Sequence, residues 1–212
     1  MEQVKPEVAM RDRLFEAALK LFARKGYHAT SVREIVEAAG VTKPVLYYWF
    51  RSKDGVFRHL MAEAVATHRA VLAEVQAAGG PASERILVLG ERVMALVAEN
   101  EDAVRVLDSV YYGPREGSPA VDFTALYGEF DAYLHGLVAE AVASGEFRDD
   151  DLEGMHHALL GAFLICKVTM YEASSAGCPA CGDMEAHDVR RIMRVAMDGM
   201  WAKGPVREAH EW

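Results

Sequence analysis

Hydrophobic residues recur along most of the chain at the three- and four-residue spacing of amphipathic helices, and no segment alternates convincingly as a strand would. In the stretch 11–25, for example, the apolar residues fall on one stripe of a helix. The pattern therefore predicts an all-α protein of about nine helices. The expected helices cover approximately residues 11–25, 31–39, 43–50, 53–77, 83–98, 103–112, 120–143, 151–173 and 184–203.

Several of these helices have recognisable ends. Gly26 follows the first helix and suits the left-handed conformation that often ends one, and Gly40 does the same for the second. Ser31 and Glu34 form a capping box, in which the hydroxyl and the carboxylate satisfy each other's backbone N–H groups. Ser83 is the expected N-cap of the helix at 83–98.

Residues 30–50 have the anatomy of a helix-turn-helix, in which two short capped helices are joined by a tight turn. Thr42 is the expected N-cap of the second helix, and Pro44 lies in its first turn, where a missing N–H costs nothing. Leu46 and Phe50 lie four residues apart, so we expect them to pack together against the helix at 11–25.

The outward side of the helix at 43–50 is difficult to explain as core. Lys43, Tyr47 and Tyr48 point away from its buried positions, and a surface of this kind indicates that the helix binds a partner. The major groove of DNA admits one α-helix, and tyrosine and lysine side chains donate to phosphate oxygens. Lys53 begins the next helix, where its ammonium and the backbone amides could hold a phosphate together. Packing is the alternative for the tyrosines, and it is the favoured interpretation for Trp49.

Charge divides the chain into two parts. Residues 1–60 contain 11 Lys and Arg against 7 Asp and Glu, whereas residues 61–212 contain 12 against 25, so the balances are +4 and −13. An acidic body repels DNA, so any DNA contact should be confined to the basic N-terminal part. We therefore expect a DNA-binding domain at residues 1–55 and a second domain at residues 56–212. A chance distribution of surface charge is the alternative.

Composition also limits the cellular setting. The chain has no run of about 18 uncharged apolar residues that could cross a membrane. Its first residues lack the apolar stretch of a signal peptide, and its three cysteines, an odd number, argue against a disulfide framework. We expect a cytoplasmic protein that does not bind membranes.

Residues 11–58 resemble the DNA-binding domain of the TetR family, the tetracycline-repressor-like regulators of bacteria. Pro44 stands where many members have glycine, and Trp49 stands where histidine or tyrosine is usual. Beyond this segment, only the helix order and the turn at 144–148 match. The matching residues are Ala17, Ala18, Leu21, Phe22, Gly26, Tyr27, Thr30, Ser31, Val32, Arg33, Glu34, Ile35, Ala38, Ala39, Gly40, Val41, Thr42, Lys43, Leu46, Tyr47, Tyr48, Trp49, Phe50, Ser52, Lys53 and Asp54.

The resemblance implies a ligand-responsive regulator, a repressor in most members, that binds a palindromic operator as a homodimer. Its partners would be double-stranded DNA, a second copy of the chain, and an unidentified small apolar or aromatic effector that releases the DNA. Each subunit would insert the helix at 43–50 into the major groove. The family's DNA contacts, carried over position by position, fall on Thr30, Arg33, Thr42, Lys43, Pro44, Val45, Tyr47, Tyr48 and Lys53.

The apolar stripes of the later helices and the same resemblance predict two further sets of residues, and ordinary core packing within one chain is the alternative for both. The expected effector-binding residues are Tyr111, Tyr112, Phe123, Tyr127, Phe130, His156 and Phe163. The expected dimer interface consists of Leu159, Phe163, Cys166, Met170, Val189, Ile192, Met193, Ala196 and Met200.

Cys178, Cys181 and His187 form the clearest site-like cluster outside the basic part of the chain. A CxxC pair can chelate zinc or form a redox disulfide, so a repressor that senses a metal or thiol oxidation is the alternative function. A structural zinc site needs a fourth ligand, which would have to be Asp183, Cys166 or a histidine from elsewhere in the chain. A connecting loop without a site is the competing interpretation.

Other classes of protein are less favoured. The chain has no GxSxG, GxGxxG or P-loop motif, and we expect neither catalysis nor a cofactor. His156 and His157, with the acidic run at 149–151, could suggest a metal hydrolase. That run lies where a helix should begin, however, and the helix dipole favours acidic residues there. A protein-interaction module would not need the basic N-terminal part.

Overall fold

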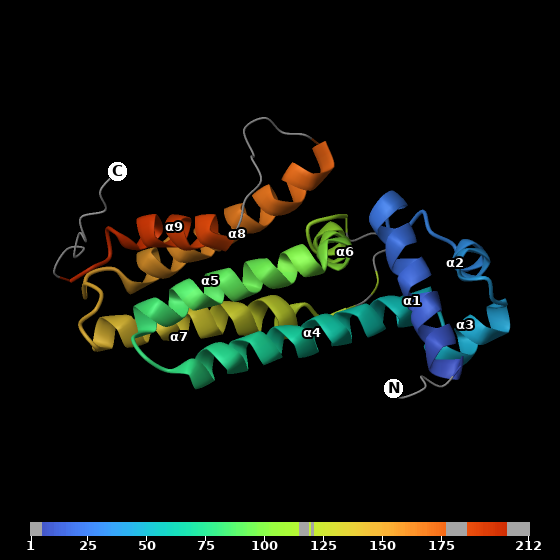
Figure 1. Ribbon diagram of the computed structural model, residues 1–212, viewed down its shortest axis with the longest axis horizontal. Helices are drawn as coiled ribbons and strands as arrows, with labels where there is room; N and C mark the ends of the chain where they lie inside the picture. Colours follow the sequence, from blue (N-terminus) through green and yellow to red (C-terminus); the bar gives the residue numbers. More distant parts are fainter. Residues whose placement is uncertain (1–5, 115–118, 120, 177–185, 203–212) are drawn as a thin grey trace. The chain divides into compact units, whose positions relative to one another are not determined.

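The computed structural model describes residues 6–114, 119, 121–176 and 186–202 (Figure 1). Within these residues the protein is all-α, as predicted, and its only strand-like pairing is an isolated bridge between Phe147 and Trp201. The described elements are α1 (Pro6–Lys25), α2 (Val32–Ala39), α3 (Lys43–Phe50), α4 (Lys53–Ala78), α5 (Ala82–Glu99), α6 (Glu101–Tyr111), η1 (Thr124–Gly128), α7 (Glu129–Ala143), α8 (Leu152–Ala176) and α9 (Ala186–Met197).

Three helices differ most from the predicted ranges. α1 begins at Pro6, several residues earlier than expected. The helix expected at 120–143 is divided, because a π-helical turn, η1, precedes α7. α9 ends at Met197 rather than near residue 203, and the chain then pairs with the turn after α7. There the backbone N–H of Arg148 donates to the Met200 carbonyl at 2.7 Å, which helical periodicity does not predict.

The chain forms two compact units. The first comprises Met1–Ala66 and Asn100–Phe123, and the second comprises Thr67–Glu99 and Thr124–Trp212, so the division falls within α4. The boundary predicted after residue 55 concerns function rather than compactness, and it stays a prediction.

The first unit has its own hydrophobic core. α1 packs against α2, α3 and α6, and the apolar stripe predicted for α1 faces inward. Leu14, Ile35, Leu46 and Phe57 have no exposed surface, and Phe22 is 2% exposed. Burying an aliphatic or aromatic side chain of this size contributes about 1.5–3 kcal/mol. This core holds α2 and α3 on α1, which leaves their other sides facing outward.

In the second unit, α5 packs against α7, α8 and α9, and α8 and α9 lie side by side (Figure 1). Gly90 allows α5 to approach α9 closely. A Cβ atom at this position would lie 3.2 Å from Met193 Cγ and 3.4 Å from Val189 Cγ1. Contacts of that length are tighter than ordinary packing distances, so a larger residue would push the two helices apart.

Glu146, in the turn after α7, caps the N-terminus of α5. Its carboxylate accepts hydrogen bonds from Ala82 N at 3.1 Å, from Ser83 N at 3.0 Å and from the hydroxyls of Ser83 and Ser144. Burial alone would raise the pKa of Glu146, but the hydrogen bonds from Ser83 outweigh it and hold that pKa below its ordinary value. The prediction that Ser83 is the N-cap is therefore wrong, because α5 begins at Ala82 and the cap comes from a distant turn.

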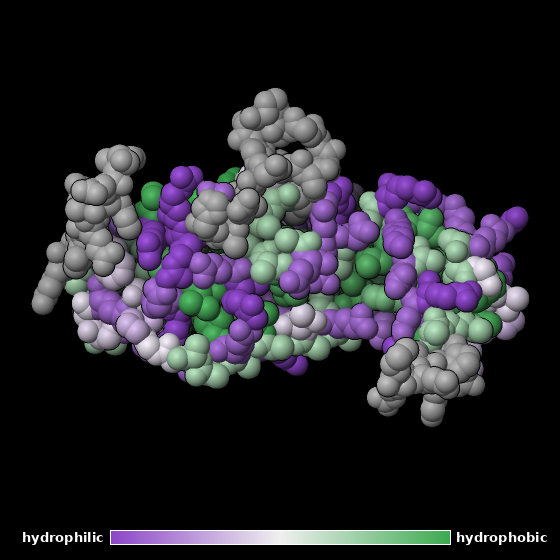
Figure 2. Space-filling model, viewed as in Figure 1, coloured by the Kyte–Doolittle hydropathy of each residue, from purple (hydrophilic) through white to green (hydrophobic). Residues whose placement is uncertain are grey.

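The surface is mixed in polarity. Figure 2 shows hydrophilic and hydrophobic residues intermixed on the visible face, as expected when apolar atoms contribute more than half of a protein's accessible surface. Among the described helices, none combines the length and the apolar composition needed to cross a membrane.

Candidate nucleic-acid interface

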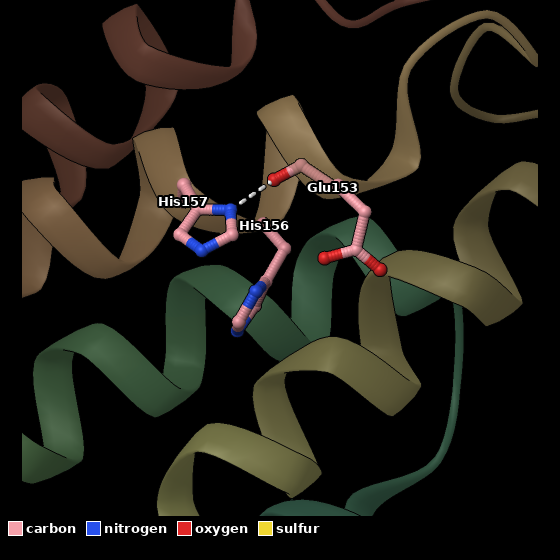
Figure 3. Close-up of side chains that lie close together, drawn as sticks. All are labelled: Glu153, His156 and His157. Atoms are coloured by element: carbon pink, nitrogen blue, oxygen red, sulfur yellow. Dashed lines mark hydrogen bonds between the residues drawn. The ribbon is translucent and has the colours of Figure 1, made fainter.

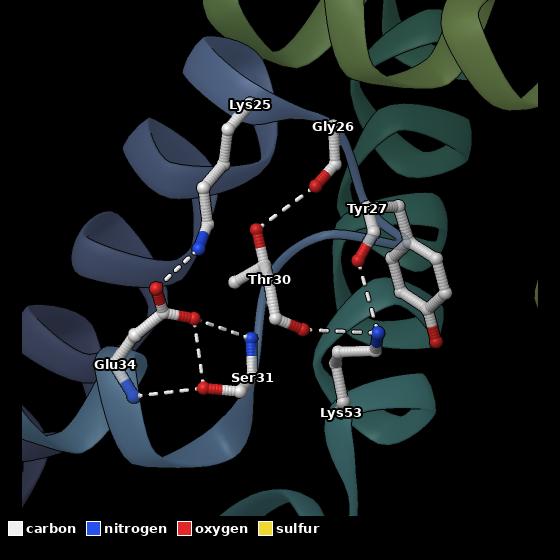
Figure 4. A network of polar contacts seen from close by, with 7 residues as sticks. All are labelled: Lys25, Gly26, Tyr27, Thr30, Ser31, Glu34 and Lys53. Atoms are coloured by element: carbon white, nitrogen blue, oxygen red, sulfur yellow. Dashed lines mark hydrogen bonds and ion pairs between the residues drawn. The ribbon is translucent and has the colours of Figure 1, made fainter.

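The loop between α1 and α2 is held by a network of polar contacts that centres on Thr30 and Lys53 (Figure 4). Thr30 is 2% exposed, and its hydroxyl donates to the Gly26 carbonyl at 2.9 Å. The Lys53 ammonium donates to the carbonyls of Tyr27 and Thr30, at 2.9 and 3.0 Å, and lies 4.2 Å from the centroid of the Tyr27 ring. Lys53 therefore fastens the N-terminus of α4 to the loop that precedes α2.

Both residues were expected to contact DNA, and the structure gives each a structural role. The Thr30 side chain is buried and already hydrogen-bonded, so it offers no free surface to a partner. Burial lowers the pKa of Lys53 from its ordinary value. An ammonium has three N–H donors and two of them reach carbonyls here, so a phosphate contact through the third stays a prediction.

The predicted capping box at the start of α2 is confirmed. The Glu34 backbone N–H donates to the Ser31 hydroxyl at 3.3 Å, and the Ser31 N–H donates to the Glu34 carboxylate at 2.9 Å. The same carboxylate accepts a hydrogen bond from the Lys25 ammonium at the end of α1, which, with the Ser31 bonds, lowers the pKa of Glu34 to about 2 (Figure 4). Gly40 then ends α2 in the left-handed conformation, with φ of 64°. Local sequence signals thus define α2 at both ends.

α3 is buried on one side and carries exposed aromatic residues on the other. Leu46 has no exposed surface and Phe50 is 6% exposed, whereas Tyr47 is 47% exposed and Tyr48 is 70% exposed. Aromatic side chains usually pack, so two adjacent tyrosines in solvent leave a large apolar area available to a partner. The alternative that these tyrosines are packing residues of this protomer is therefore not supported. Trp49 is half-buried, with its ring centroid 5.0 Å from that of Tyr48.

The start of α3 adds polar groups to this surface. Thr42 has the extended backbone of an N-cap, but within the described residues its hydroxyl makes no capping hydrogen bond, which corrects the prediction that its side chain caps α3. Thr42, Lys43 and Pro44 are all exposed, and Val45 is half-buried. The hydroxyl and the ammonium therefore lie at the N-terminus of the helix, where residues of a major-groove helix contact base edges.

Arg33 lies on the exposed side of α2. Its guanidinium donates to the Glu37 carboxylate at 2.7 Å, in an i,i+4 pair whose two side chains are both exposed. This hydrogen bond to Glu37 is the main reason that the pKa of Arg33 is raised. Solvent screens an exposed pair of this kind, so it contributes little to stability and a phosphate could replace the carboxylate at little cost. Arg33, Thr42, Lys43, Pro44, Tyr47 and Tyr48 define the α2–α3 surface.

The α2–α3 surface combines one short protruding helix, cationic and hydroxyl donors, and flat rings. Such a helix fits the major groove, where hydroxyls and cations donate to phosphates and apolar atoms contact thymine methyl groups. Comparison with known proteins leads to the same interpretation. Residues 14–60 match the family described as bacterial regulatory proteins of the tetR family. The HTH-type transcriptional repressor BdcR of Escherichia coli is 34% identical over 139 residues, which cover 62% of this chain and 70% of BdcR.

The chain belongs to the TetR family of bacterial regulatory proteins.

Other relatives and solved structures extend the comparison. The HTH-type transcriptional activator FasR of Mycolicibacterium smegmatis is 48% identical over 48 residues, which cover 23% of this chain and 22% of FasR. The chain spans between 27% and 53% of the length of the first curated relatives that it matches. Among solved structures, the TetR family transcriptional regulator PfmR from Thermus thermophilus is 25% identical, with a TM-score of 0.70 over 89% of this chain and 98% of PfmR. The resemblance predicted from residues 11–58 is confirmed, and so is the all-helical fold.

The residues predicted to bind an effector are divided between the two units. Tyr111 and Tyr112 are 45% and 61% exposed in the first unit, where the Tyr111 ring lies 5.1 Å from that of Phe123. In the second unit, Phe163 is buried and its ring lies 5.0 Å from that of Phe130. The remaining predicted residues of that unit are the half-buried Tyr127 and the buried His156. The role of all seven in a TetR-type effector site stays a prediction.

His68 was not predicted and belongs with Phe130 and Phe163. It is 7% exposed, its ring centroid lies 5.7 Å from that of Phe130, and its Nε2 atom has no hydrogen-bond partner among the described residues. Burial lowers the pKa of His68, so its ring is neutral at physiological pH. A polar atom buried without a partner is unusual, and it marks this aromatic cluster as a place where a ligand could supply the missing bond. A lone histidine on an amphipathic helix gives no such signal in sequence.

The residues predicted to form the TetR-type dimer interface lie mostly inside one protomer. Leu159, Phe163, Cys166, Val189, Met193 and Met200 are buried in the single chain, and Met170, Ile192 and Ala196 are half-buried. The apolar side chains of α8 and α9 that are exposed are different from the predicted ones. Leu164 is 43% exposed, Ile165 is 58% exposed and Val195 is 67% exposed. We call these three residues the α8–α9 face.

The alternative metal- or redox-sensing site lies largely outside the structure. Cys178 and Cys181 lie outside the described residues, and the side chain of His187 is not among those described. Their role stays a prediction. Cys166 is a free, buried cysteine of α8, and burial raises the pKa of its thiol.

Proposed function

We propose that the protein is a transcriptional regulator that binds duplex DNA by inserting α3 into the major groove. The observation that supports this most directly is the exposure of Tyr47 and Tyr48 on a helix whose opposite side is anchored by Leu46 and Phe50. The charge balance of +4 over residues 1–60 agrees with a role in contacting phosphates. The proposed contacts comprise Arg33, Thr42, Lys43, Pro44, Val45, Tyr47 and Tyr48, with Lys53 and Thr30 supporting them.

The test begins with selection of bound fragments from genomic DNA, followed by titration of the selected duplex. Lys43→Ala should weaken binding to all sequences and reduce the slope of log K against log salt by about 1 per subunit. Lys20→Ala, on the exposed side of α1, removes the same charge from the same unit and serves as the matched control. Equal effects of both changes would show that net charge alone drives binding. If the selection recovers no DNA fragment, DNA binding is refuted.

The proposal includes a homodimer, as in the TetR family generally. Three large apolar side chains on two adjacent helices, Leu164, Ile165 and Val195, support the α8–α9 face as the contact surface. A twofold axis through such a surface creates a self-complementary contact and requires a palindromic operator. The protein would then act in the cytoplasm, where bacterial DNA lies.

We also propose that a small apolar or aromatic effector controls DNA binding. The His68, Phe130 and Phe163 cluster supports a ligand with a ring or alkyl body and one hydrogen-bonding group. A gamma-butyrolactone receptor is among the proteins of similar fold, and that receptor's name denotes a small oxygen-containing ligand. The effector must bind the DNA-free conformation more tightly than the DNA-bound one, because equal affinity would shift nothing. Repressors and an activator both occur among the relatives, and we favour repression.

A further inference from the structure

Three histidines and two carboxylates meet where α7 packs against α8, in the second unit. Asp131 and His135 lie four residues apart on α7, and Glu153, His156 and His157 lie at positions i, i+3 and i+4 on α8. Residues at these spacings lie on one side of a helix. Figure 3 shows the three residues of α8, for which one potential ligand atom from each lies within 4.8 Å of the others.

Side chains of the two helices approach each other closely within this cluster. His135 Nε2 lies 3.2 Å from Glu153 Oε1, and His156 Nε2 lies 3.2 Å from Asp131 Oδ1. The His156 ring centroid lies 5.2 Å from the centroids of both His135 and His157. The acidic residue at the start of α8 is not part of this arrangement, because Asp151 accepts a hydrogen bond from Gly154 N at 2.9 Å and caps the helix.

His156 is the residue that points to a ligand. It is 4% exposed, and among the described residues neither of its ring nitrogens has a hydrogen-bond partner, since Asp131 is near but not aligned for a hydrogen bond. A buried imidazole without partners is costly, because each ring nitrogen has lost water without gaining a hydrogen bond. A cation bound to one nitrogen would satisfy that lone pair, and nearby carboxylates would offset its charge.

One ring nitrogen of His157 takes part in a hydrogen bond, and the other is available to a ligand. Its Nδ1 lies 2.7 Å from the backbone carbonyl of Glu153, as Figure 3 shows. A carbonyl only accepts hydrogen bonds, so the proton lies on Nδ1 and Nε2 carries the lone pair. Histidines that bind metals commonly donate their second N–H to a carbonyl or a carboxylate in this way.

We propose that Glu153, His156 and His157 bind a divalent transition-metal ion of the zinc type, with His135 as the fourth ligand. Two imidazoles and a carboxylate match the nitrogen and oxygen ligands that zinc prefers, whereas magnesium prefers oxygen alone. Donors that each lie about 2.1 Å from zinc are at most about 4.2 Å apart. The observed limit of 4.8 Å applies to Glu153, His156 and His157, which therefore need only small side-chain rotations. His135 is added because its Nε2 atom lies 3.2 Å from Glu153 Oε1. The ion would join α7 to α8.

The experiment measures zinc binding by calorimetry with the full-length protein, after a chelator has removed bound metal. Wild-type protein should bind zinc at this site and melt at a higher temperature in its presence, and magnesium should do neither. The double variant Glu153→Gln/His157→Gln should bind one zinc ion fewer per protomer. Both changes lie on exposed positions, so they test the site without disturbing the buried His156.

The double variant Cys178→Ser/Cys181→Ser is the matched control, because those cysteines are the other candidate zinc ligands. The cysteine variant should retain the zinc ion that the Glu153→Gln/His157→Gln variant loses. His135→Gln should weaken zinc affinity by more than the roughly 10–100-fold that loss of an outer-shell partner causes. The proposal fails if the Glu153→Gln/His157→Gln protein binds zinc like wild type, or if only the cysteine variant loses zinc. The zinc measurement does not depend on DNA binding, so it tests the metal site separately from the proposed function.

Discussion

The Lys53 ammonium hydrogen-bonds to the carbonyls of Tyr27 and Thr30 and stacks on the Tyr27 ring. The Tyr27 hydroxyl in turn donates to Asp54, and burial is the main reason that the pKa of Tyr27 is raised. These contacts tie the first turn of α4 to the segment that leads into α2. At the scale of single residues, we therefore expect Lys53 to affect the proposed DNA binding through the placement of α2 and α3.

Lys53→Met separates this structural role from a phosphate contact, because methionine keeps an unbranched side chain but removes the ammonium. We expect the free energy of unfolding to fall by about 1–2 kcal/mol, since hydrogen bonds from a charged donor to two carbonyls are lost. Urea unfolding followed by circular dichroism measures this change. If Lys53→Met weakens DNA binding but leaves the unfolding midpoint unchanged, Lys53 is a phosphate contact and not a structural residue.

At the scale of helices, the ends that depend on neighbouring residues could be predicted and those that depend on distant ones could not. The Ser31–Glu34 box and the glycines after α1 and α2 act over a few residues, so sequence alone reveals them. Glu146 caps α5 from a turn that lies 63 residues from Ser83 in the sequence, and no local sequence pattern predicts that contact. The early end of α9 has the same cause, because its terminal backbone pairs with the turn after α7.

Glu146→Gln tests the cap of α5. Since the folded-state pKa of Glu146 lies below its ordinary value of 4.5, the carboxylate stabilises the folded state above that pH, and the contribution is lost as the pH falls through the folded pKa. We expect the variant to be less stable than wild type by about 1 kcal/mol at neutral pH, a typical value for a helix cap. The difference should shrink below about pH 4. Urea unfolding at both pH values measures it, and a difference independent of pH would contradict the role of the charge.

At the scale of the whole molecule, the exposed side of α3 was easier to predict than the exposed apolar residues of α8 and α9. The α2–α3 surface lies on a short helix with two clear buried positions, so its outward side follows from periodicity. α8 is apolar on several sides, and its sequence does not say that Leu159 and Cys166 face inward while Leu164 and Ile165 face outward. The packing of α5, α7 and α9 against α8 decides this, and that packing depends on contacts distant in sequence.

Ile165→Asp should weaken the proposed dimer, because it places a charge in the middle of an apolar contact. Sedimentation velocity should show a shift to monomer, and affinity for a palindromic duplex should fall with it, while the helical content stays unchanged. Ala73→Asp, at an exposed position of α4, adds the same charge and should leave the assembly intact. A dimer that withstands Ile165→Asp would show that another surface makes the contact.

The exposed tyrosines of α3 provide the most direct test of the central proposal. Titration of a selected genomic duplex should show that Tyr47→Ala/Tyr48→Ala binds at least about tenfold more weakly than wild type, since loss of a base or backbone contact costs about 1–3 kcal/mol. Both side chains are largely exposed, so the melting temperature should not change. Wild-type affinity in this double variant, with the fold intact, would contradict the assignment of α3 as the DNA-binding helix.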